Sequence, residues 1–453
     1  MLKIAPSMTP DRFEWGCATS SFQIEGAGAE GGRVPSIWDD FCAQPGRIKD
    51  ASSGLIACDH FHRYAEDVRL IADLGFKHYR FSIAWSRIVS TSNQLNTHGL
   101  DFYKRLLDEL EQHGITPNAT LFHWDLPSHL EGGWLNRETA YRFADYAQLI
   151  AQHLGDRLPR VTTLNEPWCS AFLGYDLGVF APGAQNRESA LCAAHHLLLA
   201  HGLGVQAWRS ERENTALGIV LNPELCDPET PSPQDKYAAM LAECERNECF
   251  LNPLFGREWP VELKAQMGTQ IKICKEGDLE ICAQPLDFIG LNYYTRSIAK
   301  APESDSDKTR GYLFVAPDPT KELTSIGWEI YPEGLSRVIN HLNAKWPLPP
   351  IWITENGAAD NTPLEDGICD DDLRCNYLQT HLDQLAKLLE QGADIRGYYV
   401  WSLLDNFEWA QGYSQRFGIV HVDFQTQKRT PKKSALMIQA LLHHATANDV
   451  SHP

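Results

Sequence analysis

Apolar and polar positions alternate in two rhythms along the chain. Short runs rich in β-branched and aromatic residues are followed by longer segments whose apolar residues recur with helical spacing. The short runs predict strands, because such side chains pack well on a pleated surface. We expect eight strands, at residues 13–21, 78–85, 116–124, 161–166, 216–222, 287–294, 351–355 and 395–404.

The segments between these runs predict helices, because their apolar residues recur at i, i+3, i+4 and i+7. One helical pattern begins at Phe61, and Asp59 stands where its side chain would cap the helix. Others cover residues 103–110 and 143–154. Glycines follow three of these patterns, at Gly75, Gly114 and Gly155, the position where a left-handed glycine commonly ends a helix.

Strands that alternate with helices predict a parallel sheet, and eight such units in 453 residues predict a (β/α)8 TIM barrel of the α/β class. A doubly wound open sheet is the alternative, because periodicity does not report whether a sheet closes. No linker or repeat divides the sequence, so we expect residues 1–453 to form a single domain. Residues 300–324 predict a long irregular loop near the active-site end, as part of a pocket wall or as solvated chain.

The net charge of −19 makes nucleic acid and anionic membranes poor partners, because their phosphates would be repelled. A small neutral or cationic ligand fits better. The first residues lack the apolar core of a signal peptide, and no apolar run is long enough to cross a bilayer. We therefore expect a cytoplasmic protein, whose oligomeric state the sequence leaves open.

The twelve cysteines include no C-x-x-C pair, which predicts reduced, mostly buried thiols rather than a disulfide framework or a zinc site. Cys369 and Cys375 could pair in an oxidising compartment, an interpretation we favour less. His60 and His62 alternate as some metal ligands do, but they stand at the start of a helical pattern. We therefore expect neither a metal nor a cofactor.

Polar and aromatic residues cluster where the eight predicted strands end. Barrel enzymes place their chemistry at these carboxyl ends. A carboxyl pair, amides and stacking rings are what the cleavage and recognition of a sugar require. The set comprises Gln23, Glu25, Arg80, His123, Trp124, Asp125, Asn165, Glu166, Asn222, Asn292, Tyr294, Glu355, Asn356, Trp401, Asp405, Glu408 and Trp409.

Each of these residues also has a purely structural interpretation. An arginine in a strand commonly pairs with a carboxylate, a strand-end tryptophan fills the barrel, and an asparagine satisfies backbone groups. Only Glu166 and Glu355 favour a functional interpretation on their own. The convergence of so many polar groups on one mouth favours chemistry for the set, and no glycine-rich phosphate loop or Walker-type lysine competes with it.

Seven motifs in this order resemble glycoside hydrolase family 1, the β-glucosidase family, over nearly the whole chain. They are FEWGCATSSFQIEG at 13–26, YRFSIAWSRI at 79–88, LFHWDLP at 121–127, TLNEP at 163–167, GLNYY at 290–294, ITENG at 353–357 and WSLLDNFEW at 401–409. The resemblance implies a (β/α)8 barrel and a retaining β-glycosidase acting by double displacement, most simply on terminal non-reducing β-D-glucosyl residues. A catalytically silent sugar-binding protein and a metal-dependent barrel hydrolase are the competing hypotheses. The first would usually have lost one carboxylate, and the second lacks a ligand set.

By this resemblance Glu166 is the acid/base and Glu355 the nucleophile, with their carboxyls roughly 5–5.5 Å apart. Arg80 and Tyr294 would support an ionised Glu355, with Asn292 nearby, and Asn165 would bond the sugar 2-hydroxyl. The further substrate-binding residues implied are Gln23, His123, Trp124, Trp328, Trp401, Glu408, Trp409 and Phe417. Trp168, Trp328 and residues 300–324 are candidates for the aglycone side.

Glu408 bears on the sugar that is accepted. Relatives acting on 6-phosphorylated sugars typically have a small residue there, with a lysine and a tyrosine shortly after, where this chain has Gln415 and Phe417. A carboxylate would repel a phosphate, so we expect neutral sugars. Glu166 also differs from the glutamine of the plant thioglucosidase branch, and His421, where tyrosine is common, is a minor departure.

Overall fold

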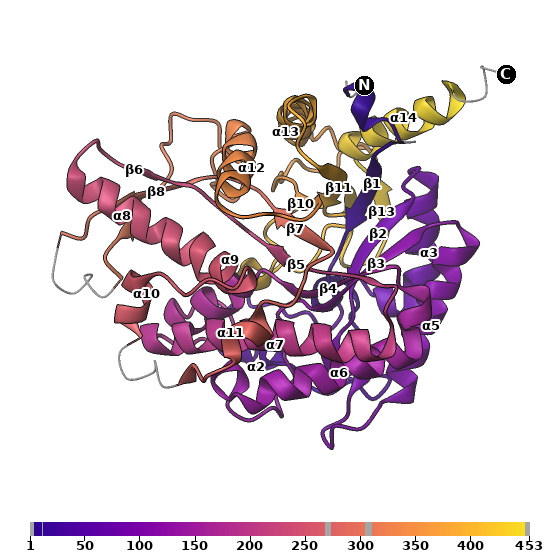
Figure 1. The fold of residues 1–453 in the computed structure, drawn as a ribbon. Coiled ribbons are helices and arrows are strands. Elements are labelled where there is room, and N and C mark those ends of the chain that lie inside the picture. Colours follow the sequence, from indigo (N-terminus) through magenta and orange to yellow (C-terminus); the bar gives the residue numbers. More distant parts are fainter. Residues whose placement is uncertain (1–3, 11, 268–272, 304–309, 449–453) are drawn as a thin grey trace.

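Eight parallel strands close into a barrel at the centre of the molecule (Figure 1). The computed structural model describes residues 4–10, 12–267, 273–303 and 310–448. Around the ring the order is β1, β11, β10, β7, β5, β4, β3 and β2, so the doubly wound alternative is wrong. The strands are β1 (Glu14–Ala18), β2 (His78–Ser82), β3 (Thr116–Phe122), β4 (Arg160–Asn165), β5 (Ala216–Leu221), β7 (Phe288–Asn292), β10 (Ile351–Asn356) and β11 (Ile395–Trp401).

All eight predicted strands are confirmed as the strands of this barrel. Their uninterrupted apolar runs reflect burial on both faces, as in β7 and β10, where every residue is buried. The first and last were predicted too long, because the chain leaves the sheet after Ala18 and Trp401. The second ends at Ser82, since Trp85 begins a helical turn of its own.

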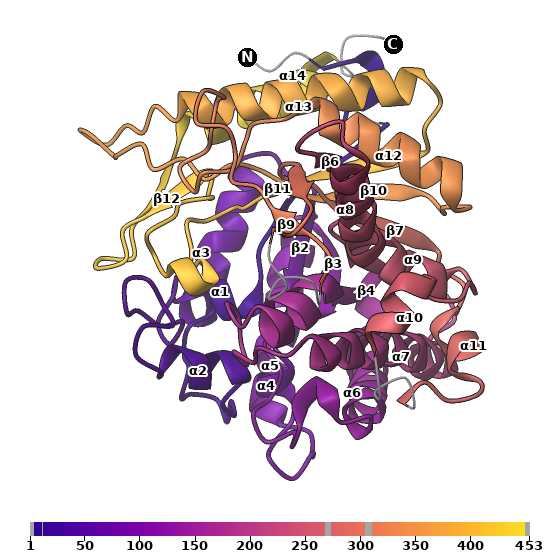
Figure 2. The ribbon, with the colours of Figure 1, turned by 90° about the vertical axis from the view of Figure 1, so that its left-hand side faces the viewer.

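Helices cover the outside of the barrel and connect successive strands (Figures 1 and 2). The longer ones are α3 (His60–Asp73), α5 (Thr97–Gln112), α6 (Glu138–Leu154), α7 (Arg187–Glu211), α8 (Pro233–Glu243), α12 (Glu333–Lys345), α13 (Asp372–Glu390) and α14 (Lys433–Asn448). Short ones are α1 (Ser21–Ile24), α2 (Ile37–Cys42), α4 (Trp85–Ile88), α9 (Cys249–Leu254), α10 (Val261–Gln266) and α11 (Asp278–Cys282).

One helix-end prediction is wrong. Asp59 precedes α3 in a left-handed conformation (φ 53°), and its side chain bonds to His62 Nδ1 at 2.6 Å instead of capping the helix. Gly155 does follow the end of α6 at Leu154, as predicted, but with φ −58° it continues into a 3-10 turn before β4. Gly75 and Gly114 do end their helices with positive φ, at 87° and 63°.

Two small sheets were not predicted, because strands of two to four residues show no recognisable period. One pairs β6 (Cys226–Pro228), β8 (Ser297–Lys300) and β9 (Leu313–Phe314) and packs against α8; the other pairs β12 (Val420–Val422) with β13 (Arg429–Pro431). Residues 300–324 are therefore not wholly irregular, although 304–309 lie outside the described residues. Phe314, Val315 and Pro317 line the central cavity, so of the two placements the pocket wall is confirmed.

Candidate active site

The mouth at the carboxyl ends of the barrel strands opens into a cavity of about 480 Å³. Parallel strands all end at this mouth, so residues far apart in the sequence meet there. Gln23, Arg80 and Asn165 lie behind the wall, each fully buried. The other catalytic and substrate-binding candidates line the cavity: His123, Trp124, Glu166, Asn292, Tyr294, Trp328, Glu355, Trp401, Glu408, Trp409 and Phe417. Of the remaining strand-end residues Asn222 lines it too, whereas Glu25, Asp125, Asn356 and Asp405 do not.

Glu355, in β10, is held by two charged or polar donors. Arg80 Nη1, from β2, donates to Glu355 Oε1 at 2.6 Å, and Tyr294 OH donates to Oε2 at 2.6 Å. Burial raises the pKa of Glu355, while the charge of Arg80 and both hydrogen bonds oppose that rise. Two residues further on, position 357 admits no side chain, because a Cβ there would lie 1.8 Å from the backbone oxygen of Trp401.

Glu166, directly after β4, receives only neutral donors. Asn292 Nδ2 donates to its Oε1, and Cys169 Sγ donates to its Oε2 at 3.0 Å. Burial and then the charge of Glu355 raise the pKa of Glu166 to about 7. Of the two neighbouring carboxyls, Glu355 therefore loses its proton first, and Glu166 keeps its proton as an acid near neutral pH.

Two asparagine amides connect the carboxyls. Asn165 Oδ1 accepts from Arg80 Nη2 at 2.6 Å and from Asn292 Nδ2 at 3.1 Å. Asn292 Oδ1 accepts in turn from Thr354 at 2.7 Å, which fixes the amide that reaches Glu166. The polar groups from β2, β4, β7 and β10 therefore form one continuous network.

His123 lies among aromatic rings on one side of the cavity. Its ring stacks on Trp401 (centroids 5.8 Å apart) and on Trp409 (6.1 Å), and Trp409 in turn contacts Trp124. Burial and the charge of Arg80 hold the pKa of His123 well below its usual value, so the ring is neutral. Nε2 accepts from Asn165 Nδ2, and Nδ1 is buried without a partner among the described residues.

Trp328 and Phe417 form the opposite aromatic wall with Tyr294. The Trp328 ring meets Tyr294 edge-on at 5.5 Å, and Phe417 meets Tyr294 at 6.0 Å. This wall stands beside the nucleophile candidate, because Tyr294 is the residue that bonds Glu355.

Glu408 is a third carboxyl of the cavity. Burial and the charges of Glu355 and Glu166 raise the pKa of Glu408 to about 8, against a hydrogen bond from Gln23. Near neutral pH its side chain is thus a neutral acid that can both donate and accept. The sequence predicts that the Glu408 carboxylate repels a phosphate. Because Glu408 ionises only near pH 8, this repulsion applies fully only above that pH.

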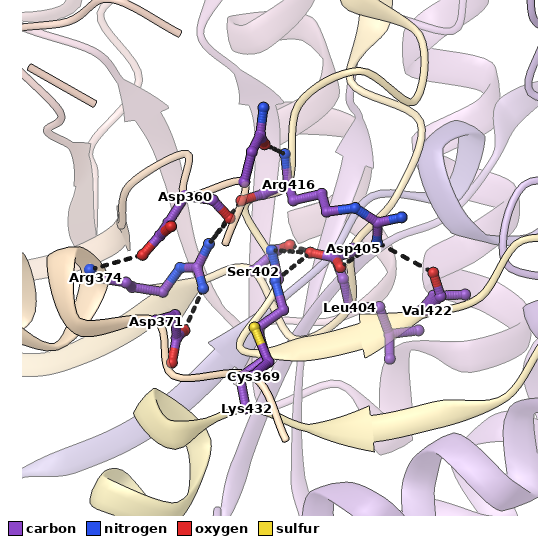
Figure 3. Close-up of polar contacts among 12 residues, drawn as sticks. Asp360, Cys369, Asp371, Arg374, Ser402, Leu404, Asp405, Arg416, Val422 and Lys432 are labelled. Carbon is purple, nitrogen blue, oxygen red and sulfur yellow. Dashed lines mark hydrogen bonds and ion pairs between the residues drawn. The ribbon is translucent and has the colours of Figure 1, made fainter. Parts of the chain in front are cut away.

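A buried ionic network holds the segment that carries Trp401, Glu408 and Trp409 (Figure 3). Asp405 is fully buried and accepts from Lys432 Nζ at 2.7 Å and from Arg416 at 2.6 Å. The next residue, Asn406, bonds Gln23 Nε2 at 3.0 Å. The segment at the start of α14 is in this way tied to the loop that carries Glu408 and Trp409.

Three cavity residues other than glycine have left-handed backbones: Trp124 (φ 79°), Glu166 (φ 45°) and Trp409 (φ 48°). Such conformations cost about 1–3 kcal/mol each and persist where the surroundings impose them. Glu166 N donates to Val220 O at 2.9 Å, and Trp124 Nε1 donates to Asn165 O at 2.9 Å. These hydrogen bonds hold two of the three residues in their left-handed conformations.

Sequence reasoning missed Cys169, Glu224 and Arg246, which line the same cavity. Arg246 pairs with Glu224 and lies over the ring of Trp168, 3.6 Å from its centroid. Cys169 could have been found, because it stands three residues after Glu166 in what proves to be a π-helical segment, Cys169–Asp176. Arg246 lies outside every motif, so the sequence offered no signal for it.

The described residues include no group of three or more His, Cys, Asp or Glu side chains that could hold a metal ion. His60 Nδ1 bonds Asp67 inside the protein, whereas His62 is at the surface, so this pair does not converge. All twelve cysteines are free, Cys369 and Cys375 among them. No helix in the described part of the chain is both long and apolar enough to cross a membrane.

A barrel with two carboxyls of unlike protonation at its mouth, walled by amides and aromatic rings, defines the class of barrel glycosidases. The model of glycosyl hydrolase family 1 matches residues 6–446. The chain belongs to this family, whose enzymes are retaining β-glycosidases.

Similar proteins agree in sequence and in fold. The chain is 45% identical over 439 residues to a β-glucosidase of an Agrobacterium species, covering 95% of each chain. The crystal structure of the AHE enzyme from Alicyclobacillus herbarius is 42% identical, with a TM-score of 0.93 over 98% of this chain and 99% of that one. Virulence factor SghA of Agrobacterium tumefaciens, in complex with its substrate analog salicin, is 44% identical, with a TM-score of 0.92 over 95% of both chains.

Proposed function

We propose that the chain is a β-glucosidase that releases terminal non-reducing β-D-glucosyl residues from glucosides and short oligosaccharides. Glu355 acts as the nucleophile and Glu166 as the acid/base. The observation that carries these roles is the unlike environment of the two carboxyls: a guanidinium touches Glu355, while an amide and a thiol touch Glu166. The β-glucosidase name of the Agrobacterium relative supports the choice of glucose.

In the first step the Glu355 carboxylate attacks the anomeric carbon, and the bond to the leaving oxygen breaks. Glu166 gives its proton to that oxygen, so the aglycone departs as a neutral alcohol. A glycosyl ester of Glu355 remains, and Glu166 is now a carboxylate.

The second step begins with Glu355 uncharged, because its carboxylate has become an ester. The charge that Glu355 has lost is one of the causes of the raised pKa of Glu166, so the ester favours ionised Glu166. Glu166 takes a proton from water, the hydroxyl adds to the anomeric carbon, and the ester bond breaks. Both glutamates return to their starting states, and the sugar keeps its β configuration.

The sugar is held by groups on both sides of this pair. Asn165 serves the 2-hydroxyl by exchanging its bond to His123, and Trp401 carries the apolar face of the ring. The residues that serve the other hydroxyls and close the pocket are Gln23, His123, Trp124, Asn292, Tyr294, Glu408, Trp409 and Phe417, with Arg80 holding the nucleophile.

The outer part of the cavity suits an apolar or aromatic leaving group. Trp168, Phe314, Val315, Ile326 and Trp328 line it. SghA binds salicin, an aryl β-glucoside, in a barrel of the same fold. We include aryl glucosides and short β-linked glucose chains from cellulose breakdown among the substrates. The free thiols suit a reducing compartment, the cytoplasm, with residues 1–453 acting as one catalytic domain.

A kinetic panel tests this assignment. Aryl β-glucoside, β-galactoside, β-fucoside and 6-phospho-β-glucoside are compared with cellobiose and laminaribiose under one set of conditions. We expect the highest kcat/KM for neutral β-glucosides and β-glucose as the first product seen by NMR. Preference for the phosphorylated sugar, or release of α-glucose, would overturn the proposal.

A further inference from the structure

Cys169 makes two contacts with the proposed acid/base. Its backbone N–H donates to the carbonyl oxygen of Glu166 at 2.9 Å, and its Sγ donates to Glu166 Oε2 at 3.0 Å. Asn292 donates to Oε1, the other carboxyl oxygen. Each oxygen of Glu166 therefore has one donor, and one of the two is a thiol.

Asn222 fixes the direction of that thiol. It follows β5, and its Nδ2 donates to Cys169 Sγ at 3.5 Å. Because the sulfur accepts on that side, its single hydrogen remains for Glu166 Oε2. Burial and the charge of Glu166 raise the pKa of the Cys169 thiol well above its usual value, so the thiol stays protonated while Glu166 titrates.

We propose that Cys169, oriented by Asn222, is a positioning residue that donates to Glu166 and favours its anion over its acid form. The inference rests on the proposed role of Glu166 and extends it to residues outside the sugar contacts. A donor to the charged form always favours that form. Cys169 therefore helps the second step, which needs the carboxylate, at the expense of the first, which needs the acid.

The competing explanation is that Cys169 only fills space, since it is 5% exposed. Val and Thr have nearly the same shape and differ by one donor, and Ser differs from Ala by a hydroxyl that adds one donor and one heavy atom. Cys169→Val is therefore compared with Cys169→Thr, and Cys169→Ala with Cys169→Ser. A space-filling role would depend on volume, whereas the proposed role depends on the donor.

The measurement is kcat/KM for an aryl β-glucoside against pH, whose alkaline limb reports the acid in the free enzyme. We expect the limb of Cys169→Val about half a pH unit above that of Cys169→Thr, the size expected for one weak hydrogen bond. The Ala and Ser variants should show the same order, and they decide the matter if the bulkier pair does not fold. Coincident limbs within each pair would overturn the proposal.

A double-mutant cycle tests the part played by Asn222. Asn222→Leu alone should raise the alkaline limb, because the thiol hydrogen is no longer directed. In the Cys169→Val background the same change should have no further effect. An equal shift of the alkaline limb in both backgrounds would overturn the proposal that Asn222 acts through Cys169. If the unaltered enzyme hydrolyses no β-glucoside, the proposed function itself fails, a result distinct from coincident limbs in an active enzyme.

Discussion

Of the two central glutamates, Glu355 has a cationic hydrogen-bond donor and Glu166 has neutral ones. Arg80 contacts Glu355 directly, and Glu166 is bonded by Asn292 and Cys169, which carry no charge. Both carboxyls are buried, so this difference in partners, and not a difference in exposure, decides which one is ionised.

Replacing Glu166 with Ala should separate substrates by their leaving groups. The leaving group of cellobiose is the 4-hydroxyl oxygen of a glucose, which needs the proton, so kcat/KM for cellobiose should fall by about 10²–10⁴. A dinitrophenyl β-glucoside needs no proton in the first step, so its kcat/KM should fall far less. Steady-state kinetics on both substrates measures this, and an equal loss would contradict the acid role.

Replacing Glu408 with Gln should stabilise the protein at alkaline pH. The ordinary carboxyl pKa of 4.5 is raised to about 8 in the folded protein. The stability that the protonated group contributes is present below its unfolded pKa and is lost as pH rises through about 8. Thermal unfolding at about pH 5 and about pH 9 should show the variant gaining a few degrees over the parent at the higher pH. A Tm difference that does not change with pH would contradict the raised pKa.

The loop after β11 is held by buried ionic contacts in addition to backbone hydrogen bonds to neighbouring segments. Residues 402–408 belong to no helix or strand, and the Asp405–Lys432 pair joins them to the start of α14 (Figure 3). Both side chains are fully buried, and removing one partner of such a pair costs about 3–5 kcal/mol.

Lys432→Met should therefore raise KM for β-glucosides more than it lowers kcat, because Glu408 and Trp409 lose their support. The control is Arg160→Met, which breaks the Arg160–Glu14 pair at the opposite end of the barrel. It should lower Tm and leave KM unchanged. Equal effects of the two variants on KM would show that the network serves stability alone.

Strand existence was predictable because barrel strands buried on both faces leave uninterrupted apolar runs. The ends of strands and helices were less predictable. Asp59 carries the usual signal for the start of a helix, but a local turn with His62 took precedence, and the strands β6, β8 and β9 are too short to show a period. In the site, Glu166 and Glu355 stand in recognisable motifs, whereas the contact of Cys169 with Glu166 depends on a π-helical turn that no pattern announces.

At the scale of the whole molecule, closure of the barrel assembles the site. Arg80 and Glu355 are 275 positions apart, and Gln23 and Glu408 are 385 apart, yet both pairs are in contact. β1 lies between β2 and β11, which places the first and last sugar-facing segments side by side. Periodicity predicts the elements, but it cannot show this closure or the depth at which each carboxyl is buried.

The central claim is that Glu355 forms a covalent bond with the sugar. A 2-deoxy-2-fluoro-β-glucoside with a dinitrophenyl leaving group tests it most directly, because the fluorine slows both steps and the leaving group restores the first. Mass spectrometry of the digested enzyme should find the fluoroglucosyl group on the peptide that contains Glu355, and on none from Glu355→Ala. An adduct on another residue, or an active enzyme that forms none, would contradict the account.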